Sequence, residues 1–145
     1  MDRLHRLKWT FAAALGAAVI ALAGCAAILS TKRVDVFLSG AEQVAPVITG
    51  ATGNGIFIVE ENLGVSGYVI VSGMAPVAAH IHTGARGSNG GIAIGLVKVA
   101  DNKWEVPTGA KFSSAQYQAF LAGETYVNVH SAAHRGGEIR AQLRP

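Results

Sequence analysis

Hydrophobic and polar residues alternate in short runs along most of this chain. Glycine, proline, asparagine and serine cluster between the runs, as in residues 50–55, 73–76 and 84–91. Several short strands separated by such turn signals predict an all-β sandwich or barrel. The runs expected to form strands are 34–38, 55–59, 63–72, 92–99, 126–130 and 138–143.

One segment, residues 113–123, has the pattern of a short helix instead. Ser113 can cap its first turn, Gln116 has the spacing of a capping box, and Gly123 can end it. Tyr117, Phe120 and Leu121 would share one face by the i, i+3, i+4 rule. We therefore expect one helix that packs on the sheet through these three side chains.

The strand alternation also places several polar side chains together. His80 and His82, at i and i+2, project from the same face of a strand. In residues 126–130 Val127 and Val129 would face the core, so that Asn128 and His130 face the other way. If residues 126–130 and 138–143 pair as a hairpin, Glu138 and Arg140 join the same polar face.

This polar face has two interpretations. Three imidazoles on neighbouring strands can bind a transition metal such as copper or zinc, with Glu138 as a fourth ligand or as a hydrogen-bond acceptor behind the ligands. Asn128 and Arg140 would then lie around the site. Alternatively, the face is a solvent-exposed polar sheet surface whose histidines are hydrogen-bonding scaffold groups. His134 lies in the expected turn and is predicted to be exposed and not a ligand.

The beginning of the chain is different in kind. Arg3, Arg6 and Lys8 precede an almost wholly apolar stretch from Trp9 to Ala21, and small residues then lead to the only cysteine, Cys25. A basic start, a short apolar region and small residues before a cleavage point are typical of a secretory signal. An uncleaved anchor is the alternative, because the stretch from Trp9 to Leu29, at about 20 residues, could span a bilayer.

The residues Leu22-Ala23-Gly24-Cys25 resemble the lipobox of bacterial lipoproteins. The resemblance implies a signal peptide over residues 1–24, a lipid on the Cys25 sulfur and a tether over residues 25–33. Because Ala26, and not aspartate, follows the cysteine, the analogy with Gram-negative sorting favours the outer membrane where the source has one. Both interpretations of this segment leave the rest of the chain outside the cytoplasm, in the cell envelope.

Removing the leader also changes the charge. The full chain has 12 Lys and Arg against 9 Asp and Glu. Without Asp2 and the three basic residues of the leader, nine basic and eight acidic residues remain, a net charge of +1. No basic stripe is left that would indicate a nucleic-acid partner. About 120 mature residues suffice for one domain with its own core, which must fold without a disulfide.

Four separate motifs resemble the CHRD domain, which is named after chordin. They are Leu38 to Val47, Ala79-His80-Ile81-His82-Thr83-Gly84 with the following Gly87-x-Asn89-Gly90, Tyr126 to His130, and Gly136 to Leu143. The chain departs from the family at Ala45, where a second proline is common, and at Ala141, where glycine is frequent. The resemblance covers about residues 34–144, and we place the domain at 34–145.

The resemblance implies an immunoglobulin-like or related Greek-key β-sandwich or barrel. It also implies a secreted or anchored protein, since bacterial members are typically of this kind. Our first hypothesis is therefore a non-enzymatic binding or interaction module, held on the membrane by its lipid and meeting a protein partner of the envelope or outside it. The second is a copper- or zinc-binding protein using His80, His82 and His130, and a redox enzyme at that metal is the third. Whether the three imidazoles converge distinguishes the first from the second.

Overall fold

The computed structural model describes residues 30–145, so the leader and Cys25 lie outside the described residues. The elements are β1 (Thr31–Ser39), η1 (Gly40–Glu42), β2 (Thr52–Glu60), β3 (Val65–Ser72), β4 (Pro76–Thr83), β5 (Ile92–Gly95), β6 (Val97–Ala100), β7 (Lys103–Glu105), α1 (Ser114–Leu121), β8 (Thr125–Ser131) and β9 (Ile139–Leu143). The prediction of an all-β fold with one short helix is confirmed. The strand β1 begins at Thr31, so that residues 31–33 of the expected tether belong to the sheet.

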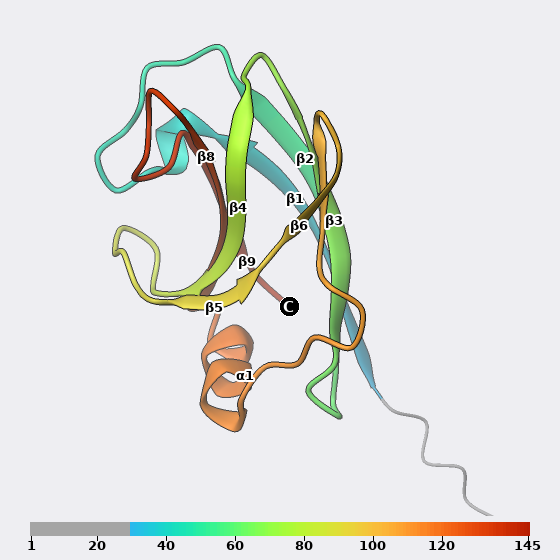
Figure 1. Cartoon of the computed structure of the whole chain (residues 1–145). Coiled ribbons are helices and arrows are strands. Elements are labelled where there is room, and N and C mark those ends of the chain that lie inside the picture. The colour runs from blue at the N-terminus through green and yellow to red at the C-terminus, as the bar shows by residue number, and fades with distance from the viewer. Residues whose placement is uncertain (1–29) are drawn as a thin grey trace, which may run out of the picture.

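The strands form one nine-stranded sheet in the order β5-β4-β8-β9-β1-β2-β3-β7-β6. The strands β1 and β9 are joined by a single residue pair, Ser39 with Arg140, whereas β1 and β2 pair along nine residues. The sheet therefore turns sharply at β1 and β9, and Figure 1 shows β4 and β8 facing β1, β2 and β3 across the core. Since β5 continues into β6 through Leu96, the two ends of the sheet are connected by the chain, and the result is a nearly closed barrel.

The run at 92–99 was expected to be one strand but is divided between the two ends of the sheet. Leu96 separates β5 from β6, is buried, and donates its backbone N–H to the carbonyl of Ala79. Before this point the chain pairs with β4, and after it the chain pairs with β7. Because residues 92–99 are hydrophobic almost throughout, their sequence did not indicate that the chain changes its pairing strand at Leu96.

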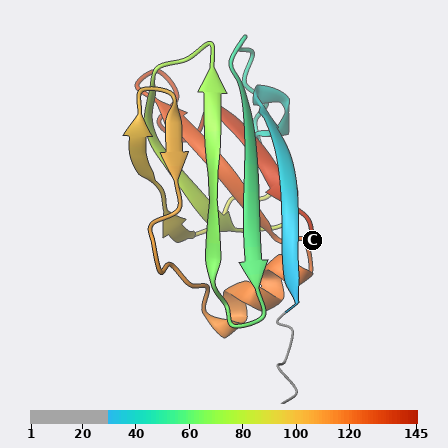
Figure 2. The same ribbon diagram turned by 90° about the vertical axis from the view of Figure 1, so that its right-hand side faces the viewer.

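The core lies between the two layers and consists of the alternate apolar residues that the sequence indicates. Val127 and Val129 of β8 and Ile139 of β9 are fully buried, as are Leu38 and Phe57 on the opposite layer. Figure 2 shows β1, β2 and β3 side by side, with α1 across the end of the barrel.

The helix α1 is capped as expected. Ser113 Oγ accepts the backbone N–H of Gln116, Gln116 Oε1 accepts that of Ser113, and Gly123 follows with φ of 72°. Phe120 is fully buried and Tyr117 is half-buried. The prediction that Leu121 shares this contact is wrong, because its side chain is 40% exposed. The helix has eight residues and lies across one end of the barrel, so it buries a narrower face than a helix that lies along a sheet. No helix within residues 30–145 is long and apolar enough to cross a membrane.

Candidate metal centre

The face of β4, β8 and β9 that points away from the core is built as the alternation predicts. The strand β8 pairs with β4 on one side and with β9 on the other, which places His80 opposite Asn128, and Asn128 opposite Arg140. The expected hairpin of β8 and β9 and the pairing of the two histidine-bearing strands are both present. This face therefore carries the predicted polar side chains, and Tyr126 and Gln142 lie on it as well.

Three segments cover this face, so the prediction of a solvent-exposed polar surface is wrong. Arg140 is 1% exposed and Asn128 3%, under residues 84–91, residues 41–49 and the turn at 132–137. The polar side chains satisfy the backbone of these segments. Arg140 donates to the carbonyls of Ser88 and Ala85, and Gln142 donates to the carbonyl of Gly84. The face is thus a buried hydrogen-bonding layer that holds loops in place.

Asn128 and Glu138 belong to this layer and not to the histidine cluster. Asn128 accepts the side-chain N–H of Gln43 at 2.8 Å and donates to the carbonyl of Gly136. The Glu138 carboxylate accepts the Thr49 hydroxyl at 2.7 Å. Although burial of Glu138 opposes its ionisation, hydrogen bonds from Ser131 and Thr49 outweigh this and lower the pKa of the carboxyl. The structure therefore does not bring the expected fourth ligand to the three histidines.

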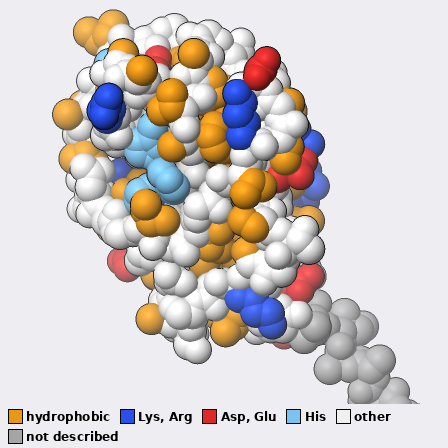
Figure 3. Space-filling model, viewed as in Figure 1, with side chains coloured by type: hydrophobic (Ala, Val, Ile, Leu, Met, Phe, Trp, Pro, Cys, Tyr) orange, Lys and Arg blue, Asp and Glu red, His pale blue; other side chains and the backbone are white. Residues whose placement is uncertain are grey.

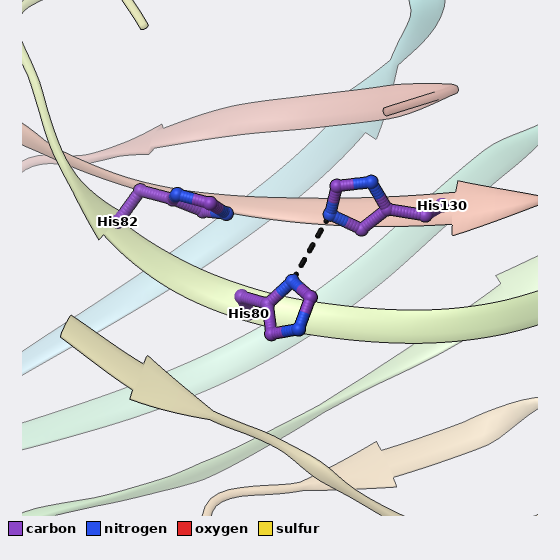
Figure 4. Close-up of side chains that lie close together, drawn as sticks. All are labelled: His80, His82 and His130. Carbon is purple, nitrogen blue, oxygen red and sulfur yellow. Dashed lines mark hydrogen bonds between the residues drawn. The ribbon is translucent and has the colours of Figure 1, made fainter. Parts of the chain in front are cut away.

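The three histidines do converge. One ring nitrogen of each of His80, His82 and His130 lies within 4.8 Å of the other two. Nδ1 of His80 is 3.1 Å from Nε2 of His130. In Figure 4 the ring of His82 extends from β4 toward this pair. Ligand nitrogens about 2.1 Å from a tetrahedral zinc ion are roughly 3.4 Å apart, so small side-chain movements suffice to bring all three onto one ion.

Backbone carbonyls fix the tautomers of two of these rings. Nδ1 of His82 lies 3.0 Å from the carbonyl oxygen of Gly90, and Nδ1 of His130 lies 2.9 Å from that of Arg135. Because a carbonyl oxygen only accepts, each Nδ1 must carry the proton and each Nε2 must carry a lone pair. A ring N–H held by a carbonyl behind the ligand atom is the usual support of a metal-binding histidine.

The Nε2 atom of His82 is the most informative atom of the cluster. His82 is 8% exposed, and this nitrogen is among the buried side-chain atoms without a hydrogen-bond partner within residues 30–145. A buried lone pair without a partner costs free energy that folding must supply elsewhere. Here the lone pair faces the other two imidazoles, which is where a metal ion would satisfy it.

The charge state of the rings also suits a metal. Burial, followed by the proximity of His130 and His82, lowers the pKa of His80 below its ordinary value of 6.5. Burial lowers the pKa of His82 as well, against the effect of its bond to Gly90 and with help from His130 and Arg140. Both rings are therefore neutral at pH 7, and a neutral imidazole is the form that binds metal.

His134 is half-buried, not exposed as expected, and takes no part in the cluster. Its backbone closes the turn after β8, where its N–H bonds to Ser131 Oγ. Sequence reasoning missed Gln43, Thr49, Tyr126 and Gln142 as parts of the buried layer. Alternation alone could have placed Tyr126 and Gln142 there, since each is two residues from a named polar residue on its own strand.

A sequence model of the CHRD domain family matches residues 34–143, which is nearly the whole of the described part of the chain. The chain therefore belongs to the CHRD family. No curated protein and no solved structure matches it.

Proposed function

We propose that this protein is a lipid-anchored CHRD domain of the cell envelope that binds a divalent transition-metal ion, zinc or copper, through His80, His82 and His130. Membership of the CHRD family suggests an extracellular binding module. The convergence of the three imidazoles favours a metal ion over an unspecified partner as what this module binds. The observation that carries the proposal is Nε2 of His82, which is buried next to the other two imidazoles and has no hydrogen-bond partner within residues 30–145.

Metal binding requires one rearrangement of protons. In the metal-free protein Nδ1 of His80 donates to Nε2 of His130, which accounts for both atoms. An ion between the rings would take the lone pair of His130, and His80 would move its proton from Nδ1 to Nε2. The other two rings already present lone pairs inward. The site is therefore largely formed in advance, which lowers the cost of binding.

Titration of the purified full-length protein with zinc and copper tests the proposal. We expect one saturable site per chain, and metal retained on isolation. Each of the changes His80→Ala, His82→Ala and His130→Ala should weaken binding by more than about 100-fold, because even a group behind a metal ligand contributes 10–100-fold. His134→Ala is the matched control and should leave the affinity unchanged.

Folding of each variant is checked by circular dichroism, and His80→Ala is the most informative because His80 is only partly buried. Absence of a saturable site in the folded wild-type protein would contradict the metal proposal. The cluster would then be a hydrogen-bonded structural feature, and an interaction module that recognises a protein partner would remain.

The lipid anchor is proposed from Leu22-Ala23-Gly24-Cys25 and the basic, apolar segment before it. Two or more acyl chains hold a protein on a membrane stably, where one chain binds reversibly. Cys25→Ser should abolish labelling with palmitate and leave an unprocessed precursor. Continued labelling of the Cys25→Ser protein at its N-terminus would exclude this anchor.

A further inference from the structure

A cavity of about 600 Å³ lies directly over the three histidines. Its wall consists of the three imidazoles, the side chains of Val77, Ala78, Ile92 and Ala132, and Arg135. The volume is within the range of small-molecule sites. Figure 3 shows the histidines at the surface, with hydrophobic side chains gathered around them.

The histidines leave a coordination position that opens into this cavity. They supply three nitrogens, and zinc or copper binds at least one ligand more. Glu138 does not fill that position, because its carboxylate accepts the Thr49 hydroxyl and is not among the ligand atoms that converge. Since all three histidines line the cavity and no fourth protein ligand within residues 30–145 joins them, a molecule in the cavity can supply it.

The charge of the cavity favours an anion. Three neutral imidazoles leave the +2 charge of the ion uncompensated. Arg135 adds a cation at the rim, where it is exposed and forms no ion pair with any residue of 30–145. The lining contains no Asp or Glu.

The aliphatic side chains in the cavity wall favour an anion that also has an apolar part. Val77 and Ile92 are 56% and 59% exposed, each beside an irregularity in the pairing of its strand. Ile92 of β5 pairs with His82 of β4, Val77 lies on β4 three residues before His80, and both line the cavity. Exposed large aliphatic side chains next to a polar centre are typical of a ligand-binding pocket.

We propose that this cavity binds a small amphipathic carboxylate, whose head group coordinates the histidine-bound metal and pairs with Arg135 while its aliphatic tail packs on Val77 and Ile92. The inference rests on the proposed metal site and names the ligand class of that site. It requires no chemical step, since the ligand binds and leaves unchanged.

Cobalt(II) tests this inference, because its visible absorption spectrum reports the ligands of the ion. The full-length protein is first titrated with cobalt and then, once loaded, with octanoate, acetate or octanol. Octanoate should change the spectrum in a saturable manner and bind about tenfold tighter than acetate, because its longer tail buries more apolar surface. Octanol has the tail without the charge and should neither change the spectrum nor displace octanoate.

Two variants locate the ligand. Ile92→Ser should remove most of the preference for octanoate over acetate, and Arg135→Gln should weaken both anions by about fivefold. Ile48→Ser and Arg144→Gln are the matched controls, since both residues are exposed and neither lines the cavity. They should leave both affinities unchanged.

The outcomes separate the two proposals. Cobalt binding without any effect of the carboxylates, or with equal affinities for octanoate and acetate, overturns the cavity proposal and leaves the metal site intact. Competition by octanol overturns the part that requires an anion. Failure of cobalt, zinc and copper to bind overturns the metal site and this inference together.

Discussion

His82 is held by its neighbours in a way that leaves one ring nitrogen free. Its ring stacks on Tyr126, with the two planes 5° apart and the centroids 4.9 Å apart. Its Nδ1 is fixed by Gly90, and the hydroxyl of Tyr126 accepts the backbone N–H of the same Gly90. The guanidinium of Arg140 lies 3.5 Å from the centre of the Tyr126 ring. A ring constrained by these contacts has little freedom to turn its Nε2 toward water.

The lowered pKa values of His80 and His82 predict a pH dependence of the metal-free protein. Each ring binds its proton less readily in the folded chain than in the unfolded chain, where the value is near 6.5. Between the folded and the unfolded pKa the unfolded chain binds more protons, so the free energy of unfolding falls as pH decreases below about 6.5. Chemical denaturation at a series of pH values measures this.

With metal bound, the free energy of unfolding should fall more steeply as pH decreases, because protons compete with the ion for the same nitrogens. Replacing His80 and His82 together by Gln should flatten the profile between pH 7 and 5. A double variant that keeps the full slope would assign the effect to other groups.

Gly137 is a second position where one residue decides the local structure. Its φ is 123°, and a Cβ there would overlap the side-chain amide of Asn128. We expect Gly137→Ala to lower the free energy of unfolding by about 2–4 kcal/mol, because backbone strain and a displaced buried amide add. Gly136→Ala is the control, since nothing lies within 4 Å of its added Cβ. A similar small loss in both variants, measured by denaturant unfolding, would show that Asn128 yields easily.

For single residues, the sequence predicted which face of a strand each side chain points to, but not whether a loop covers that face. Because side chains alternate between the two faces of a strand, His80, His82 and His130 were expected to point away from the core. The pairing of β4 with β8 then brings them together. The same rule cannot tell whether a face meets water or a loop. Thr49 and Gln43 reach Glu138 and Asn128 from segments without a regular period, so nothing in the pattern revealed that they cover the polar face.

Among the elements, the loop at 84–91 depends most clearly on a strand beneath it. Arg140 of β9 donates to the carbonyls of Ser88 and Ala85 and to Oε1 of Gln142, which itself donates to Gly84 and Gly123. Burial lowers the pKa of Arg140, but a guanidinium is so strong a base that the side chain keeps its charge. The loop in turn carries Gly90, the partner of His82. The covered layer and the histidine cluster are therefore mechanically connected.

Arg140→Lys should separate this loop from the sheet. A lysine cannot reproduce the fork of donors, so buried carbonyls lose their partners and stability should fall by about 2–4 kcal/mol. Amide hydrogen exchange should rise across residues 84–90 before it rises in the core strands. The control is Arg86→Lys on the same loop, whose ion pair with Glu42 is exposed and should contribute less than about 1 kcal/mol. Unchanged exchange in the loop would mean that Arg140 does not hold it.

Element boundaries could be predicted where local chemistry sets them. The start of α1 follows from the capping box of Ser113 and Gln116, which needs no tertiary contact. The division between β5 and β6 depends instead on Leu96 reaching Ala79, a partner that is distant in sequence. Leu121 was misjudged for a related reason, because the width of the buried face of a helix depends on what the barrel presents to it.

On the scale of the whole molecule, residues 30–145 form one hydrophobic core and contain no cysteine, so no disulfide stabilises it. All buried apolar residues of the cluster lie between Val34 and Leu143, the same span that the CHRD family covers. The cavity and the histidine cluster lie on the outer side of the β4–β8 layer, so neither interrupts the core. The chain enters this unit at β1, at the end of the barrel where α1 lies, as Figure 2 shows. A lipid on Cys25, close in sequence to Thr31, would therefore hold that end toward the membrane.

This arrangement predicts that residues 30–145 fold without the leader, lipid or metal. The buried apolar cluster is complete within this segment. The chain itself connects the two ends of the sheet at Leu96, and β1 pairs with β9 through Ser39 and Arg140. Expressed alone, the segment should give a soluble β protein that unfolds in one cooperative transition by circular dichroism and by tryptophan fluorescence, since Trp104 is 7% exposed in the fold. Two separate transitions would indicate that the layers on either side of β1 and β9 fold independently. A segment without cooperative unfolding would show that residues before Ser30 contribute to the fold.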